Sequence, residues 1–361
     1  SYKQKTIPLA KISKALTKKL QLSTNSGKET VQYNNDISIW KLIEILTRVE
    51  TSHFKPKDFT QMWKLKDECN LPPEYYLILA NLKCQKPKIK NDCLRIVERE
   101  LQGNTRQFSL MHGVIQLLSI QEGNDNNLIL NDLLTSCCSY INQMAQSDST
   151  REEDIVDLMT TIYTLGELVS LLDDKKLFDF NFVGLELLIS DNLPNGAIIP
   201  ANIRALSTIS LGKLCIMRKD ISTSFVSAFA HLLSRNSNSD PSIKCDTLIV
   251  MCDLCVRYSA LVDPHVVLMT NCFADESSVV RHQTLHVITR LIVEDYLKMR
   301  PLLFFKYVYA ITDDNEETAS FARCCLFNVL LSKSPSLLTS HFIDTIYYFS
   351  TEVKIPGIFE S

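Results

Sequence analysis

The stretch SSVVRHQTLHVITRLIVEDY, residues 277–296, decides the fold class. A mostly apolar set of its residues recurs at the three- and four-residue spacing of one helix face: Val280, Thr284, Val287, Ile288, Leu291 and Ile292. This spacing predicts an amphipathic helix that buries that face in a core.

Four other segments align with the middle of this helix. The five aligned segments are TLGEL (164–168), SLGKL (210–214), VMCDL (250–254), VITRL (287–291) and CLFNV (325–329). Their second residues are all large and apolar, and successive ones lie 46, 40, 37 and 38 residues apart. The last four segments also share a residue eight positions upstream: Ile203, Ile243, Val280 and Thr318. The second half of the chain is therefore a repeat of about 40 residues.

Each repeat holds a second helical pattern between the aligned helices. These partner helices are expected at 224–235, 265–274, 300–311 and 336–349. Two helices per 40-residue unit are typical of HEAT and armadillo arrays, in which stacked hairpins bury one continuous core. Strand signals are nearly absent. We predict an all-α fold, a HEAT-repeat α-solenoid: a superhelical array of antiparallel helical hairpins.

The first half of the chain is less regular. Amphipathic helices are expected at 37–46, 74–82, 92–101, 108–118 and 130–145, with loops near 21–36, 51–60 and 121–129 and an inserted loop at 190–202. We predict four parts: a basic helix with a polar mobile segment (1–36), irregular HEAT-like repeats (37–200), regular HEAT repeats (201–350) and a tail (351–361).

Composition excludes several classes of protein. The 361 residues carry a formal net charge of −3 and only 9 glycines, with no glycine-rich phosphate loop, membrane span or signal peptide. The 12 cysteines fall mostly in helical patterns, including Cys215, Cys245, Cys255, Cys324 and Cys325. We interpret these as buried free thiols of a reducing compartment, the cytosol or nucleus. The CxxC at Cys252 and Cys255 lacks a second pair at zinc-ribbon spacing, so core packing is favoured.

Two histidines four residues apart, His282 and His286, have the spacing of zinc proteases. The residue after the first histidine is Gln283, and an amide cannot act as the general base that this chemistry needs. The histidines also fall roughly opposite the apolar face of their helix. We expect polar-face imidazoles, with no metal, no cofactor and no small-molecule substrate.

Several motifs resemble the D-type HEAT-repeat subunit of condensin II. They are LGKLCI (211–216), VMCDLCVRYSALVDPHV (250–266), SSVVRHQTLHVITRLIVEDYLKMRPLLFFKYV (277–308) and LLSKSPSLLTSHFIDTIYYF (330–349), with weaker matches at 38–43 and 161–171. Arg281, Gln283, Thr284 and Leu285 supply an Arg-x-Gln-Thr-Leu motif, while His282, His286 and Pro301 depart from the family pattern. The likeness is dense from about 203 to 349 and sparse from about 38 to 200.

The resemblance implies a non-enzymatic scaffold subunit of an SMC complex in the nucleus. Such a subunit binds a kleisin, contacts an SMC ATPase head and contacts duplex DNA on the mitotic chromosome during chromosome condensation in the cell division cycle. Full-length relatives are much longer, so the resemblance also implies one end of a longer solenoid, the N-terminal side.

Candidate DNA contacts are lysines and arginines that could follow the phosphates of a duplex. One set is Lys11, Lys14, Lys18 and Lys19, of which the first three share a helix face. The other is the column Arg204, Lys244 and Arg281 at equivalent repeat positions, extended by Lys213 and Arg290. For the column, ion pairing with an acid in an adjacent turn, such as Asp240 or Asp275, is the favoured alternative; for the N-terminal lysines, a solvated face is equally favoured. A further cluster at Lys86, Lys88 and Lys90 is expected to be a solvated loop.

Candidate partner contacts are aromatic: Tyr258, Phe304, Phe305, Tyr347 and Tyr348. Neighbouring aromatics cannot share one helix face, so one ring of each pair is expected in the core and the other against the next repeat or a kleisin. Burial of both in the core is the favoured alternative.

Two other functions stay open. A generic HEAT or armadillo adaptor, of the transport-receptor or phosphatase-scaffold type, would share this fold. A metallohydrolase built on His282 and His286 would bind stoichiometric zinc.

Overall fold

The computed structural model describes residues 9–25, 37–60, 63, 71–101, 108–122, 128–146, 152–172, 177, 180–190, 198–234 and 240–350. Helices make up the regular structure of these residues, apart from one isolated bridge residue at Ile198. The all-α prediction is confirmed. None of the described helices is long and apolar enough to cross a membrane. The tail predicted at 351–361 lies outside the described residues, as do residues 26–36 of the loop predicted near 21–36.

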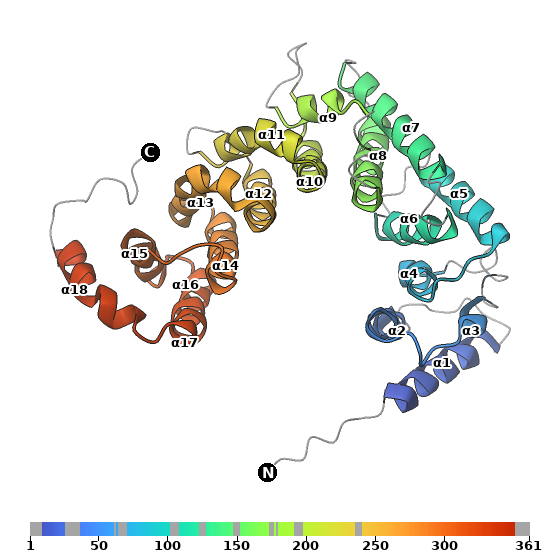
Figure 1. The fold of residues 1–361 in the computed structure, drawn as a ribbon, viewed down its shortest axis with the longest axis horizontal. Coiled ribbons are helices and arrows are strands. Elements are labelled where there is room, and N and C mark those ends of the chain that lie inside the picture. The colour runs from blue at the N-terminus through green and yellow to red at the C-terminus, as the bar shows by residue number, and fades with distance from the viewer. Residues whose placement is uncertain are drawn as a thin grey trace. The chain divides into compact units, whose positions relative to one another are not determined.

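The chain forms two compact units, residues 1–140 with 150–172, and residues 141–149 with 173–361. The described helices of the first unit are α1 (Leu9–Asn25), α2 (Ile37–Val49), α3 (Pro56–Thr60), α4 (Pro73–Asn81), α5 (Pro87–Leu101), α6 (Phe108–Glu122) and α8 (Glu152–Leu171). Helix α7 (Leu128–Met144) crosses the division between the units. In the first unit α2, α4, α6 and α8 pack against one another in sequence, and α5 packs beside α6 and α8 (Figure 1).

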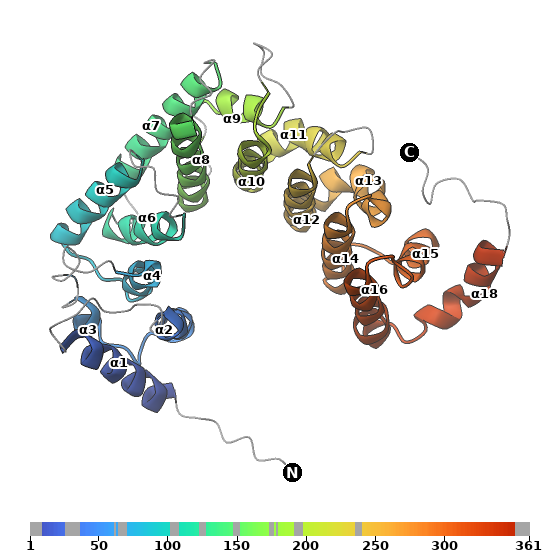
Figure 2. The same cartoon turned by 180° about the vertical axis from the view of Figure 1, so that it is seen from behind.

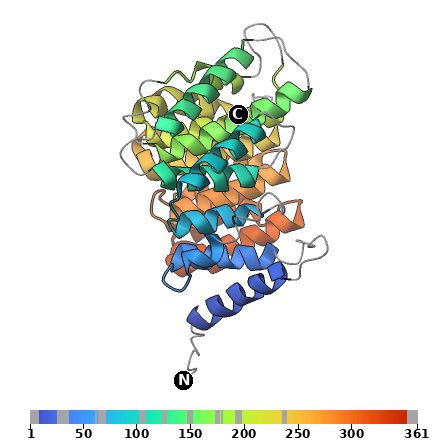
Figure 3. The same cartoon turned by 90° about the vertical axis from the view of Figure 1, so that its right-hand side faces the viewer.

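The second unit holds the regular repeats. Its helices are α9 (Val183–Leu188), α10 (Ala201–Met217), α11 (Lys219–Leu232), α12 (Pro241–Val262), α13 (Val266–Asn271), α14 (Ser278–Val293), α15 (Pro301–Ala310), α16 (Glu316–Arg323), a π-helical turn (Cys324–Leu330), α17 (Leu331–Lys333) and α18 (Leu337–Ser350). Helices α10, α12, α14 and α16 form one row (Figures 1 and 2). Helices α11, α13 and α15 lie along one side of this row. Seen from the side, the helices of this unit lie in nearly parallel layers (Figure 3).

The aligned positions of the repeat form the core. Their five large residues are at most 1% exposed: Leu165, Leu211, Met251, Ile288 and Leu326. The four upstream positions, Ile203, Ile243, Val280 and Thr318, are at most 3% exposed. The sequence repeat is therefore a repeat in space, and the predicted array of helical hairpins is confirmed.

Small residues and caps set the spacing of the row. Gly212 lets α10 approach α12, because a Cβ at this position would lie 2.5 Å from a methyl group of Val250. Asp240 caps α12 by accepting a 2.8 Å hydrogen bond from the Ser242 amide, with Pro241 as the first helical residue. The turn predicted at Asp240-Pro241 is thus confirmed.

Three local expectations are wrong. Helix α3 lies inside the loop predicted at 51–60, and α1 extends to Asn25 inside the loop predicted at 21–36. Lys88 and Lys90 belong to α5, which begins at Pro87, because proline is favourable at a first helical position. The division into four parts at residues 36, 200 and 350 stays a prediction.

Candidate functional site: ion pairs between repeats and a basic N-terminal region

The column of cations predicted from the repeats lies between successive row helices. Lys244 Nζ lies 2.7 Å from Asp275 Oδ2, in the turn before α14. Arg281 contacts the Asp313 carboxylate through two nitrogens, Nε at 2.6 Å and Nη2 at 2.7 Å, in the turn before α16. The cation of one repeat thus binds the acid that precedes the next row helix.

Both of these ion pairs are largely buried. The side chains of Lys244 and Asp275 are 13% and 9% exposed, and those of Arg281 and Asp313 are 16% and 6% exposed. The hydrogen bond from Arg281 lowers the pKa of Asp313, and the same bond raises the pKa of Arg281. Arg281 Nη1 also donates to the carbonyl oxygens of Asp275 and Glu276 at 2.9 and 3.0 Å, so it orders its own turn as well. This geometry holds the stack together and leaves little of either cation for a ligand.

The remaining members of the column differ from one another. Arg204 is buried, 7% exposed, and lies 3.4 Å from the Ile189 carbonyl oxygen. Arg290 is 44% exposed and pairs with Asp253 at 3.3 Å and Glu294 at 3.1 Å. Lys213 is half-buried on α10. A DNA contact by these residues stays a prediction.

The predicted aromatic contacts divide between core and surface. Phe304 and Phe305 are both buried, 1% and 4% exposed. Both meet α18: Phe304 lies 5.2 Å from the His341 ring and Phe305 stacks on Tyr348 at 4.8 Å. Tyr347 is 66% exposed. The rings of Phe304 and Phe305 therefore fill the space between α15 and α18.

Tyr258 has a structural role in the kink of α12. Its backbone is non-helical, with φ −140° and ψ 61°. Its hydroxyl donates to the Ile216 carbonyl oxygen at the end of α10, at 3.1 Å, and the Arg257 guanidinium lies 5.6 Å from its ring centre. Whether any of the five predicted aromatics meets a partner stays a prediction.

The sequence predicted both histidines on the polar face of their helix. The structure does not leave both of them exposed to solvent. His282 is half-buried and stacks on Phe321 of α16, with 4.4 Å between ring centres. A row helix is contacted by its neighbours on both sides as well as by its partner, so its nominally polar face is partly covered. Across the described parts of the chain, no group of three or more His, Cys, Asp or Glu side chains could hold a metal ion.

The cysteines of the described residues are free thiols, and most are buried. Burial raises the pKa of Cys252 to about 12 and that of Cys255 to about 11, which suits packing rather than redox chemistry. The prediction is wrong for Cys324, which is exposed, and Cys245 is only half-buried.

The first hundred residues carry a charge signal that the net charge conceals. Residues 1–101 contain 19 Lys and Arg but 11 Asp and Glu, whereas residues 102–361 contain 19 and 30. The net charges of the two parts are therefore +8 and −11, which average to the mildly acidic whole. Counting charge by region would have found this asymmetry from the sequence.

Most cations of this basic region lie on the surface. Between residues 9 and 101 the structure describes 13 exposed Lys and Arg side chains but only two exposed acids, Glu50 and Glu98. Lys11, Lys14, Lys18 and Lys19 are all exposed on α1. Others lie at Lys55 and Lys57, around the start of α3, and at Lys83, Lys86 and Lys88, around the turn from α4 to α5. A surface of this kind attracts phosphates.

A repeated helical hairpin, a buried aligned row and ion pairs between consecutive repeats define the HEAT class of helical-repeat proteins. Residues 242–356 match the family described as non-SMC mitotic condensation complex subunit 1. The chain is 29% identical to the condensin-2 complex subunit D3 of Mus musculus over 248 residues, 63% of this chain and 16% of the relative. It is 29% identical to the condensin-2 complex subunit D3-L of Xenopus laevis over 250 residues, 63% of this chain and 17% of the relative.

A plant relative extends the comparison: the chain is 24% identical to the condensin-2 complex subunit CAP-D3 of Arabidopsis thaliana over 201 residues, 52% of this chain and 15% of the relative. The chain is thus similar in sequence to condensin-2 D3 subunits. It spans about a sixth of the length of the curated relatives that it matches.

Proposed function

We propose that this chain is a non-catalytic HEAT-repeat part of a D3-type subunit of condensin II. In this role it binds the kleisin and an SMC ATPase head of that complex and contacts duplex DNA in the nucleus, during mitotic chromosome condensation. The similarity to D3 subunits over 63% of the chain carries the proposal, and residues 242–356 separately match a family of condensation-complex subunits.

The array itself supports a scaffold role. Stacked hairpins present a long surface built from many equivalent positions, and such surfaces bind extended partners. The generic adaptor remains the alternative function, since fold alone does not separate the two.

Complex formation tests the scaffold role. The chain is mixed with the condensin II kleisin of its own species and run on a size-exclusion column, with the condensin I kleisin as the matched control. The chain is expected to co-elute with the condensin II kleisin and not with the condensin I kleisin. Failure to bind either kleisin would contradict the proposal and favour the generic adaptor.

The DNA contact is assigned to the basic N-terminal region, because its described residues include 13 exposed cations and only two exposed acids. Each phosphate contact that is lost lowers the slope of log affinity against log salt by about 0.9. A variant with Lys11, Lys14, Lys18 and Lys19 changed to Gln is therefore expected to bind duplex DNA with a clearly shallower slope.

The control removes the same charge elsewhere. Lys219, Arg257, Lys298 and Arg300 are also exposed, so changing these four to Gln lowers the net charge equally. The control is expected to keep the wild-type slope. Equal slopes for the two variants would show that total charge, not the N-terminal region, governs the binding.

A further inference from the structure

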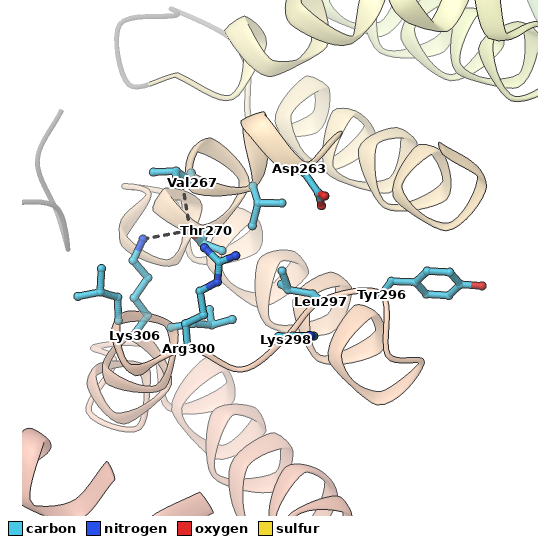
Figure 4. Close-up of a pocket in the computed structure, with 11 residues that line it drawn as sticks. Asp263, Val267, Thr270, Tyr296, Leu297, Lys298, Arg300 and Lys306 are labelled. Carbon is cyan, nitrogen blue, oxygen red and sulfur yellow. Dashed lines mark hydrogen bonds between the residues drawn. The ribbon is translucent and has the colours of Figure 1, made fainter. Parts of the chain in front are cut away.

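A pocket of about 440 Å³ lies between α13, α15 and the loop that joins α14 to α15 (Figure 4). Its volume is within the range of about 300–1,000 Å³ that is typical of ligand sites. Three of its lining residues are cations, Lys298, Arg300 and Lys306, and one is an acid, Asp263. The pocket is therefore basic.

The basic character is unusual for this part of the chain. Residues 240–350 contain nine Lys and Arg side chains and 13 Asp and Glu side chains. Ion pairs hold five of these cations: Lys244, Arg281, Arg290, Arg323 and Lys333. A sixth, Arg257, lies over the Tyr258 ring. The other three all line this one pocket.

The cations of the pocket are held in place in different ways. Lys306 is buried, 3% exposed, and donates to Asn271 Oδ1 at 2.9 Å and Thr270 Oγ1 at 3.3 Å. Arg300 is the exposed N-cap residue of α15, and Figure 4 shows it and Lys306 both reaching toward Thr270 of α13. Lys298 is exposed on the same loop. Lys298 and Arg300 make no ion pair with a described residue.

The loop that carries Lys298 and Arg300 is anchored at its start. The amides of Tyr296 and Leu297 both donate to the Leu291 carbonyl oxygen, at 2.9 and 3.0 Å. Lys333 adds a second anchor, because its Nζ lies 2.5 Å from Asp295 Oδ1 and 2.7 Å from the Val293 carbonyl oxygen. The pocket wall is thus formed before any ligand binds, which lowers the entropic cost of binding.

The rest of the lining is apolar and partly open. Val267 of α13 is 61% exposed and Leu302 of α15 is 43% exposed, while Leu303 is buried behind them. An inorganic anion would leave these side chains uncovered. A duplex would extend beyond the pocket onto a surface where acids outnumber cations. A short peptide with a carboxylate beside an apolar side chain matches both halves of the lining.

We propose that this pocket binds an acidic peptide segment of a partner protein, with its carboxylates on Lys298 and Arg300 and an apolar side chain against Val267 and Leu302. The site lies apart in the sequence from the N-terminal lysines to which the DNA contact is assigned, so the two proposals fail or succeed separately.

Selection from a random peptide library displayed on phage tests the pocket on the whole chain. The enriched sequences are expected to combine Asp or Glu with Leu, Ile or Phe. The most enriched peptide, labelled with a fluorophore, is then titrated by anisotropy against the wild type, Arg300→Glu and Lys219→Glu. Arg300→Glu should weaken binding at least about tenfold, because it places a like charge beside the carboxylate. Lys219→Glu, an equal charge reversal on an exposed lysine outside the pocket, should leave the affinity unchanged.

A charge exchange provides the positive control. The same peptide with its acids changed to Lys should bind Arg300→Glu more tightly than it binds the wild type. Enrichment of no sequence, enrichment of sequences without acids, or equal affinity for Arg300→Glu and the wild type would each overturn the proposal. Duplex DNA is also tested as a competitor of the peptide. If DNA competes, and Arg300→Glu loses both DNA binding and peptide binding, the pocket is a nucleic-acid site and the proposal is overturned.

Discussion

The first hundred residues and the repeats at 240–350 use the same kinds of cation for different purposes. In the N-terminal region, exposed Lys and Arg outnumber exposed acids by 13 to two. In the repeats, five of nine cations are held in ion pairs, and Lys244 and Arg281 bind acids that lie 31 and 32 residues further along the chain. Lys244 and Arg281 hold the stack because the next turn supplies an acid to each, whereas most N-terminal cations are exposed.

The largest effect on stability is expected at one of the two buried ion pairs of the column, Arg281 with Asp313. Asp313→Asn keeps the shape of the side chain but leaves Arg281 without a charged partner, which should cost about 3 kcal/mol of unfolding free energy. Glu316→Gln is the matched control, since its pair with Arg323 is largely exposed, at 86% and 42%. The control should change little. Urea unfolding measures both, and equal losses would contradict a structural role for the column.

A smaller loss is expected where two row helices approach closely. Gly212→Ala places a methyl group 2.5 Å from Val250, so it should cost about 2 kcal/mol. The double variant Gly212→Ala, Val250→Ala should lose less than the sum of the two single variants, because the second change removes the clash. Additive losses in thermal or urea unfolding would mean that the spacing of α10 and α12 is not set here.

The smallest effect concerns an acid of the repeats that lacks a cation. Asp246 on α12 makes no ion pair with a described residue, and burial raises its pKa to about 6. Between pH of about 4 and 6 the folded chain therefore retains a proton that the unfolded chain has lost, so stability falls as pH rises through this interval.

The Asn variant isolates this contribution. Asp246→Asn should raise the melting temperature at pH 7 and leave it nearly unchanged at pH 4, since Asp246 is protonated there in the folded state. An unchanged melting temperature at both pH values would show that Asp246 is solvated rather than buried.

Periodicity was enough to predict the core of the array. Leu211, Met251, Ile288 and Leu326 are buried because each lies at the same place on a row helix. The sequence did not reveal which side chains a neighbouring helix would cover. His282 is stacked against Phe321 by the next row helix, which a single-helix projection cannot show.

Pairing and charge were predicted less completely than burial. Asp275 was expected as a partner of the column, but Asp313, which lies at the equivalent place before α16, was not. The N-terminal lysines and the cluster at Lys86, Lys88 and Lys90 were identified, but the extent of the basic region was not, because a net charge of −3 averages a positive part and a negative part. A helical repeat separates charge along the chain, so charge must be counted by region.

Lysine reactivity in the presence of duplex DNA tests most directly whether the two regions differ in function. The chain is acetylated with and without a short duplex, and the modified lysines are quantified by mass spectrometry. Duplex should protect Lys11, Lys14, Lys18 and Lys19 while the exposed lysines of the acidic part, Lys219 and Lys298, react equally in both samples. Protection of Lys219 and Lys298 with none on the N-terminal helix would contradict the account.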